Sequence, residues 1–128
     1  MLKLITKSNL YLIILVSLFF SEIKFIYGHA ILEYSEPARR AVLYRPPNKI
    51  ILTFNERIEE SFAKIKIMDY QDKLILANQK ASNLKDDKNS IFITIPELSE
   101  GVYFIQYEVI SVDGHKVKGR YKFTIKKN

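Results

Sequence analysis

The chain has 128 residues, of which 48% are hydrophobic, and it carries eight Tyr, eight Phe and a formal net charge of +6. This length provides for one domain, and the aliphatic and aromatic content is enough to fill one core. The absence of cysteine excludes a disulfide framework, a thiolate metal site and a cysteine nucleophile.

The charges are mixed in sign along the chain. Three lysines and one glutamate lie in the first 28 residues, which leaves 17 basic and 13 acidic residues in 29–128, a net charge of +4. Because no long basic block occurs, we expect a solvated surface and no nucleic-acid partner. Weak attraction to an anionic membrane surface stays open.

Residues 1–28 have the pattern of a cleavable signal peptide. Lysines come first, an apolar run covers 10–20, and more polar residues lead to Gly28. The apolar run is shorter than the roughly 20 residues that a transmembrane helix needs. We expect export to the periplasm and cleavage after Gly28, which makes His29 the first residue of the mature protein. An uncleaved N-terminal anchor is the alternative.

From residue 29 onward, short alternating stretches of polar and apolar residues are separated by turn residues. This period of two is typical of strands, and it predicts an all-β domain over 29–128 with turns spaced as in a β-sandwich. About seven strands are expected, at 30–34, 49–55, 63–68, 73–77, 91–95, 102–111 and 119–126. Between them, 56–61 is expected as a loop or a single helical turn, and 78–89 as a polar surface loop.

Two strands near the C-terminus have the most regular alternation. The predicted inward residues are Tyr103, Ile105, Tyr107 and Val109 on the first, and Gly119, Tyr121, Phe123 and Ile125 on the second. Their aromatic side chains can supply much of the buried area of a core, so these stripes need no functional explanation.

The two histidines of the chain, His29 and His115, are the basis of the functional prediction. After cleavage, the α-amine and ring Nδ1 of His29 can chelate one ion, because α-amines and imidazoles in general can give up their protons to a metal ion near neutral pH. Asp113 and His115, on either side of Gly114, can add a carboxylate oxygen and a third nitrogen. This set suits tetragonal Cu(II), whereas Zn(II) would take it tetrahedrally. Met68 is the single methionine of the mature chain, too little for a Cu(I) cluster.

Each part of this constellation can also be explained without a metal. Asp113-Gly114 is a common hairpin turn pair that His115 could merely follow. His29 could be no more than the residue after a cleavage site, and Glu56 could belong to a solvated acidic turn. The joint occurrence favours a shared site, because both histidines lie where one site would need them.

Together these segments resemble the CopC-type copper-resistance domain. The resemblance covers essentially all of 29–128, and the ordered set of motifs is more specific than any one of them. It is carried by His29-Ala30-Ile31-Leu32 with Ser35-Glu36-Pro37, by Pro46-Pro47 before Leu52-Thr53-Phe54-Asn55-Glu56, and by Gly101-Val102-Tyr103 through Val109-Ile110-Ser111-Val112-Asp113-Gly114-His115 with Gly119 and Phe123.

The resemblance implies a seven-stranded, Greek-key, immunoglobulin-like sandwich or barrel that holds copper in the periplasm. It implies Cu(II) ligands at His29, through amine and ring, and at Asp113 and His115, with Glu56 as a further ligand or a group behind the ligands. A Met-rich loop for Cu(I), present in some members, is not expected because 69–79 contains no methionine. A membrane copper transporter is the implied partner, and we expect no room for a fused one in this chain.

We therefore expect a monomer that binds Cu(II) and carries or buffers it outside the cytoplasm for copper homeostasis and resistance, without catalysis. Two other functions fit the sequence. Polysaccharide monooxygenases also use an N-terminal histidine brace, although 100 residues leave little surface for a polymer substrate. A metal-free β-sandwich interaction module would give neither histidine a role.

Overall fold

The computed structural model describes Tyr11 and residues 29–127. The predicted signal peptide, apart from Tyr11, lies outside the described residues, so its cleavage stays a prediction. In the part of the chain that is described, no helix is long and apolar enough to cross a membrane. All strands lie within 32–125 and the buried apolar residues within 30–125. The chain after residue 28 therefore contains a complete core of its own.

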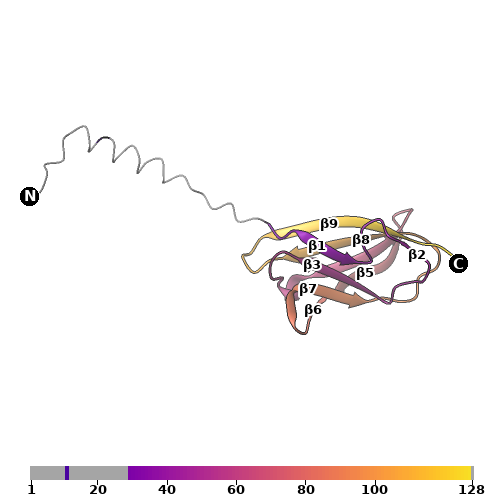
Figure 1. The fold of residues 1–128 in the computed structure, drawn as a ribbon, viewed down its shortest axis with the longest axis horizontal. Helices are drawn as coiled ribbons and strands as arrows, with labels where there is room; N and C mark the ends of the chain where they lie inside the picture. The colour runs from indigo at the N-terminus through magenta and orange to yellow at the C-terminus, as the bar shows by residue number, and fades with distance from the viewer. Residues whose placement is uncertain (1–10, 12–28, 128) are drawn as a thin grey trace, which may run out of the picture.

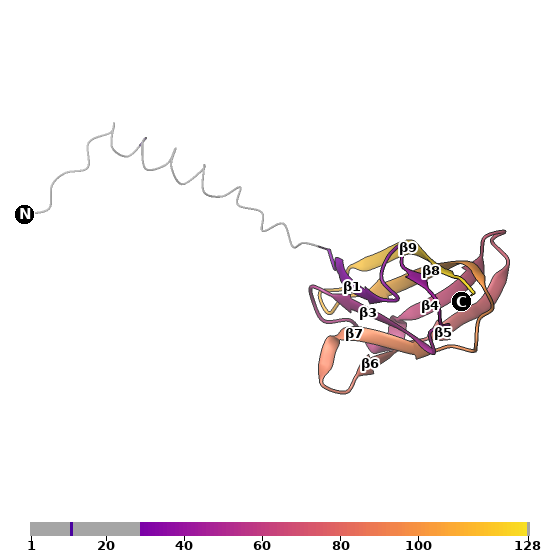
Figure 2. The same cartoon turned by 45° about the vertical axis from the view of Figure 1, so that its right-hand side comes forward.

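Two β-sheets pack face to face as a sandwich (Figure 1), and a turned view separates the two layers (Figure 2). One sheet has the strand order β1-β3-β7-β6 and the other β2-β9-β8-β4-β5. The elements are β1 Leu32–Glu36, β2 Val42–Leu43, β3 Lys49–Phe54, η1 Glu60–Phe62, β4 Lys64–Asp69, β5 Leu74–Lys80, β6 Ser82–Leu84, β7 Asp87–Thr94, β8 Gly101–Ile110 and β9 Lys116–Ile125. From β4 onward, successive strand pairs enter alternate sheets, which confirms the predicted all-β, Greek-key, immunoglobulin-like sandwich.

The core forms where the sequence alternates most regularly. The buried residues of β8 and β9 are Tyr103, Ile105, Tyr107, Val109, Tyr121, Phe123 and Ile125. Rings from both sheets meet there: Phe54 of β3 lies 5.6 Å from Tyr107 of β8, centroid to centroid, in an edge-to-face arrangement. The predicted inward faces are confirmed, because every second side chain of a strand lies on the same side of the sheet.

The structure has more strands than the seven predicted, with nine among the described residues. β2 contains two residues, which pair in parallel with the end of β9, and so short a segment has no period to detect. The single helical turn considered for 56–61 is present as η1, a 3₁₀ turn.

Residues 78–89 were expected as a loop, and this prediction was wrong. The segment contains the end of β5, all of β6 and the start of β7. Asn83 holds the β6–β7 hairpin by donating its Nδ2 hydrogens to the carbonyl oxygens of Lys88 and Ser90, both at 3.3 Å. β6 is an edge strand, and polar residues are common where a strand is open to solvent on one side. The polarity that indicated a loop belongs to an edge hairpin instead.

One close contact ties β8 to β9 and gives a test of the packing. Gly119 pairs across the ladder with Tyr107, and a Cβ added at Gly119 would lie 2.1 Å from the Tyr107 hydroxyl oxygen. Tyr107 is buried against Phe54, so its ring has little room to move. We expect Gly119→Ala to lower the free energy of unfolding by about 1–3 kcal/mol, measured by urea denaturation.

The same substitution, made in a variant that lacks the Tyr107 ring, controls for the intrinsic effect of the added methyl group. In Tyr107→Leu the ring is gone, so the same glycine substitution should cost clearly less. Equal costs in the two backgrounds would show that the Tyr107 ring does not limit the space at Gly119.

Candidate metal centre

The loop between β8 and β9 is fixed by the longest ladder among the described strands, which runs over ten residue positions. Inside the loop, the Ser111 N–H donates to the His115 carbonyl oxygen at 3.0 Å, and the Gly114 N–H donates to the Ser111 carbonyl oxygen at 2.8 Å. Gly114 has a φ of +89°, which residues with a side chain rarely adopt. The glycine therefore allows the tight turn from which Asp113 and His115 project.

The Asp113 carboxylate is held by three donors from its own loop. It accepts hydrogen bonds from the buried Ser111 hydroxyl, from the His115 backbone N–H at 3.1 Å, and, through Oδ2, from His115 Nδ1 at 2.8 Å. These bonds, with the Ser111 hydroxyl as the largest cause and the His115 ring next, lower the pKa of Asp113 to about 2. Asp113 is thus a carboxylate at neutral pH.

The same contact defines which nitrogen His115 can offer to a ligand. With Nδ1–H directed at Asp113, the neutral ring has its free lone pair on Nε2. Histidines that bind metals usually have their other ring nitrogen bonded to a carboxylate in this way, which fixes both tautomer and ring orientation. The His115 side chain is 45% exposed, so Nε2 is accessible from solvent.

His29 lies beside this loop although it comes from the other end of the domain. The centroids of the His29 and His115 rings are 5.0 Å apart, with the ring planes at 78°. The position follows from the clamp that begins β1: the Ile31 N–H donates to Asn55 Oδ1 at 2.7 Å, and the Asn55 N–H donates to the Ile31 carbonyl oxygen at 3.0 Å. Figure 1 shows the start of β1 at the same end of the sandwich as the β8–β9 loop.

Glu56 belongs to the segment between these two parts. Its neighbour Asn55 is bonded to Ile31, and on the other side the Arg57 carbonyl oxygen accepts from the Val112 N–H at 3.1 Å. Glu56 Oε1 is buried and has no hydrogen-bond partner. A buried polar atom without a partner is rare and is one mark of a missing ion or water. The structure therefore brings all four predicted site residues to one end of the sandwich.

Side-chain donors alone do not form a closed cage there. Within the described residues, no three or more His, Asp or Glu side chains are grouped so as to enclose a metal ion. Both oxygens of Asp113 are bonded inside the loop, so its role as a direct ligand stays a prediction, as do those of His29, His115 and Glu56.

Sequence reasoning gave no role to two residues that build the site. Ser111 is fully buried and its hydroxyl is the main cause of the low pKa of Asp113. Its position two residues before an aspartate was a signal that could have been used, because Ser and Asp side chains often bond locally in turns. Asn55 clamps the start of β1 from a distant part of the chain, and nothing in the sequence pattern indicates that partner.

Comparison with known proteins agrees with this fold. The CopC domain family matches residues 32–126. Protein YobA of Escherichia coli strain K12 is 35% identical over 101 residues, which cover 79% of this chain and 82% of YobA. The chain therefore belongs to the CopC domain family.

Two solved structures are similar over most of their length. The crystal structure of CopC from Methylosinus trichosporium OB3b superposes with a TM-score of 0.73 at 29% identity, covering 78% of this chain and 96% of that one. PcoC, a methionine-rich copper resistance protein from Escherichia coli, gives a TM-score of 0.63 at 26% identity, covering 77% and 100%.

The hydrogen bonds of the loop predict its acid titration in metal-free protein. The folded pKa of Asp113, about 2, lies below its ordinary value of 3.8. The interaction therefore stabilises the folded protein above the ordinary value and is lost as the pH falls toward 2. We expect the Asp113 carboxyl ¹³C NMR signal to titrate near pH 2, and Ser111→Ala to raise that midpoint because it removes the strongest donor.

The exposed Ser82 provides the control, since Ser82→Ala should leave the Asp113 midpoint unchanged. A wild-type midpoint near the ordinary value would mean that the Ser111–Asp113–His115 network is not formed in solution.

Proposed function

We propose that the protein, once residues 1–28 are removed, binds one Cu(II) ion and carries or buffers it outside the cytoplasm. The observation that supports this most directly is the 5.0 Å separation of the His29 and His115 rings, the two histidines of the chain. Cleavage after Gly28 would add the His29 α-amine to that pair. Two similar proteins are a CopC and a copper resistance protein, which supports copper as the ion.

The donors available favour Cu(II) over other ions. The His29 amine and ring nitrogen, with His115 Nε2, would supply three nitrogens, a set that suits tetragonal Cu(II), the ion with the highest affinity in the Irving–Williams order. A Cu(I) site would need soft sulfur ligands, but the chain has no cysteine. Met68, the one methionine after Met1, is 8% exposed within β4.

The acidic residues would act at different distances from the ion. Asp113 would hold the His115 ring in the orientation that binds metal, and direct ligation by Asp113 would exchange the bond to His115 Nδ1 for a bond to copper. The ion, or a water bound to it, would supply the hydrogen-bond or metal partner that the buried Oε1 of Glu56 lacks. Together the two groups would offset the positive charge of the ion.

Carriage without catalysis is the activity that this arrangement supports. The centre would lie at the end of a small sandwich, with His115 45% exposed, so a partner could reach the ion and exchange ligands. A membrane copper transporter is the partner we infer, from the family resemblance, for a protein located in the periplasm. We infer a monomer as the functional unit.

The first test removes the proposed ligands one at a time. Processed protein with His115→Ala, or with one alanine added before His29, should bind Cu(II) at least about a hundredfold more weakly, the upper end of what the loss of a supporting group costs. Affinity is measured by competition titration, and EPR reports the number of bound nitrogens. The matched control carries the added alanine after Asn128 instead and should bind like the wild type. Wild-type affinity in the N-terminally extended protein would refute a site built on the His29 amine.

The second test separates the role of Glu56 from that of the ligands. Glu56→Gln keeps the size of the side chain but removes the ionisable group at a half-buried position. We expect Cu(II) affinity to fall about 10- to 100-fold, while the metal-free protein becomes no less stable, because a neutral amide costs less to desolvate than a carboxylate. Thermal melts with and without copper measure both effects. A less stable metal-free variant would indicate that Glu56 is structural.

A third test distinguishes the carrier from an oxidative copper enzyme. Copper-loaded protein incubated with a reductant, peroxide and glycans should release no oxidised oligosaccharides, since about 100 residues provide no extended platform for a polymer. Mass spectrometry of the glycans gives the readout. Oxidised products that disappear in His115→Ala would favour the enzyme.

A further inference from the structure

The outer side of the five-stranded sheet collects positive charge. In β4 and β9 the side chains that alternate with the inward ones point to solvent and are mostly basic, whereas the outward side chains of β8 include no basic residue. We call this surface the outer basic face; its cations are Lys64, Lys66, Lys80, Lys116, Lys118, Arg120 and Lys122. Two acids pair with it: Glu108 with Lys116 at 2.5 Å and Lys118 at 3.1 Å, and Asp72 with Arg120.

This face holds the whole positive excess of the domain. Its seven cations against two acids give +5, whereas 17 basic and 13 acidic residues in 29–128 give +4. The rest of the domain is therefore close to neutral and slightly acidic. A field concentrated on one side orients a protein toward an anionic surface, which the modest total charge alone does not predict.

One hollow lies on the face, and a second lies at its β9 edge. The first, of about 190 Å³, is lined by Lys64, Lys66 and Lys118, and also by Glu108, which is paired with Lys118. The second, of about 330 Å³, is lined by Arg40 and Lys122 among other basic groups. Arg40 is held at this rim by its backbone N–H, which donates to the Lys122 carbonyl oxygen at 2.7 Å. Each hollow has several cations converging on an open space, an arrangement that suits a phosphate group.

We propose that the outer basic face docks on the headgroups of an anionic phospholipid bilayer. The face is a sheet surface dominated by lysine, a residue depleted in protein interfaces, and none of the seven residues that define it is an aromatic anchor of the kind that dominates their binding energy. Its one aromatic residue among the cations, Phe104, is covered by the Arg120 guanidinium at 4.1 Å from the ring centroid. Lysines next to an anionic bilayer each add to the attraction, without any specific partner surface. These features favour lipid phosphates over an acidic protein.

The docking does not depend on copper, so it can be tested on metal-free protein. Processed protein, which contains both sheets and the whole described core, is sedimented with vesicles of phosphatidylcholine with or without phosphatidylglycerol at low salt. We expect binding only with phosphatidylglycerol, and its loss when the salt concentration is raised. The variant Lys66→Glu with Lys122→Glu changes one cation of each hollow, and neither lysine forms an ion pair among the described residues.

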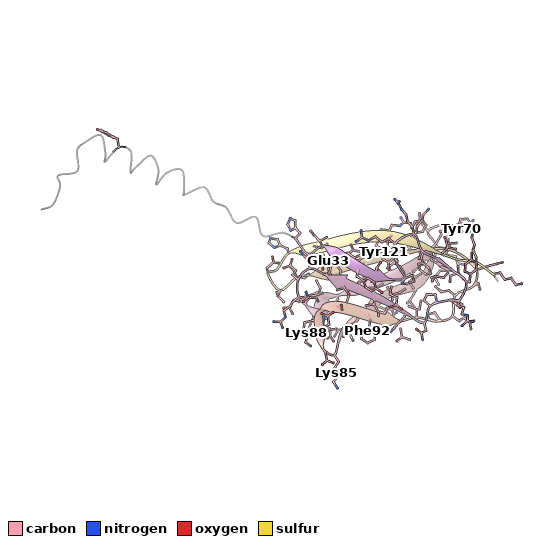
Figure 3. All side chains as sticks on the ribbon, in the orientation of Figure 1. Glu33, Tyr70, Lys85, Lys88, Phe92 and Tyr121 are labelled. Atoms are coloured by element: carbon pink, nitrogen blue, oxygen red, sulfur yellow. The ribbon has the colours of Figure 1, made fainter. Side chains whose placement is uncertain are left out.

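The double variant should bind phosphatidylglycerol vesicles at least about thirtyfold more weakly, given what each basic residue contributes beside an anionic bilayer. The matched control is Lys85→Glu with Lys88→Glu, which changes the total charge equally on the β6–β7 hairpin of the other sheet, where Figure 3 labels both lysines. It should bind like the wild type, and the melting temperatures of both variants are measured to check folding. The proposal would be overturned if both double variants bound the vesicles equally weakly, or if the wild type did not bind phosphatidylglycerol vesicles. It would also be overturned if the wild type bound only to a purified acidic protein.

Discussion

The ladder between β8 and β9 is the constraint on which the core, the candidate metal centre and the outer basic face all depend. Its register decides which half of the side chains enters the core, with Phe123 among them, and which half faces solvent. A slip of one residue would exchange the two sets, because successive strand residues point to opposite sides. Lys118 and Arg120 would then be buried and Tyr121 exposed. Because the large aromatic side chains of these strands make that exchange very costly, the register is fixed. The fixed register in turn determines the geometry of the loop between β8 and β9.

The loop in turn is ordered before any ion arrives. The buried Ser111 hydroxyl and the His115 N–H fix the Asp113 carboxylate, and that carboxylate orients the His115 ring. A preorganised group loses less conformational entropy on binding, so more of the interaction free energy is available as affinity. On the other side, Asn55 bonds both backbone groups of Ile31 and brings His29 to the loop. The fold thus positions the two halves of the candidate centre, and processing of the chain would supply the remaining nitrogen of the proposed ligand set.

Much of the fold could be predicted because burial in a sandwich leaves a period of two in the sequence. The inward residues of β8 and β9 were correct for that reason, and the two histidines were singled out by their rarity. Features without such a pattern were missed. The β6–β7 hairpin is polar because β6 is an edge, and β2 has only two residues. The bond from Asn55 to Ile31, the burial of Ser111 and the unpartnered oxygen of Glu56 result from tertiary packing, which no local spacing encodes.

The outer basic face could not be predicted from the sequence either, and it lies next to the candidate metal centre. Along the sequence the charges alternate in sign, which suggested a solvated surface of no particular direction. In the folded sheet, however, basic residues that are separated along the sequence lie next to one another. Lys64, Lys66 and Lys118 come from different strands but share one side of the sheet. Lys116 of that side directly follows His115, so the candidate metal centre lies at the end of the outer basic face rather than behind it. A domain lying on a bilayer by this face would keep its copper beside the membrane surface, where a transporter in the same bilayer could be met by lateral diffusion instead of by a search through the periplasm.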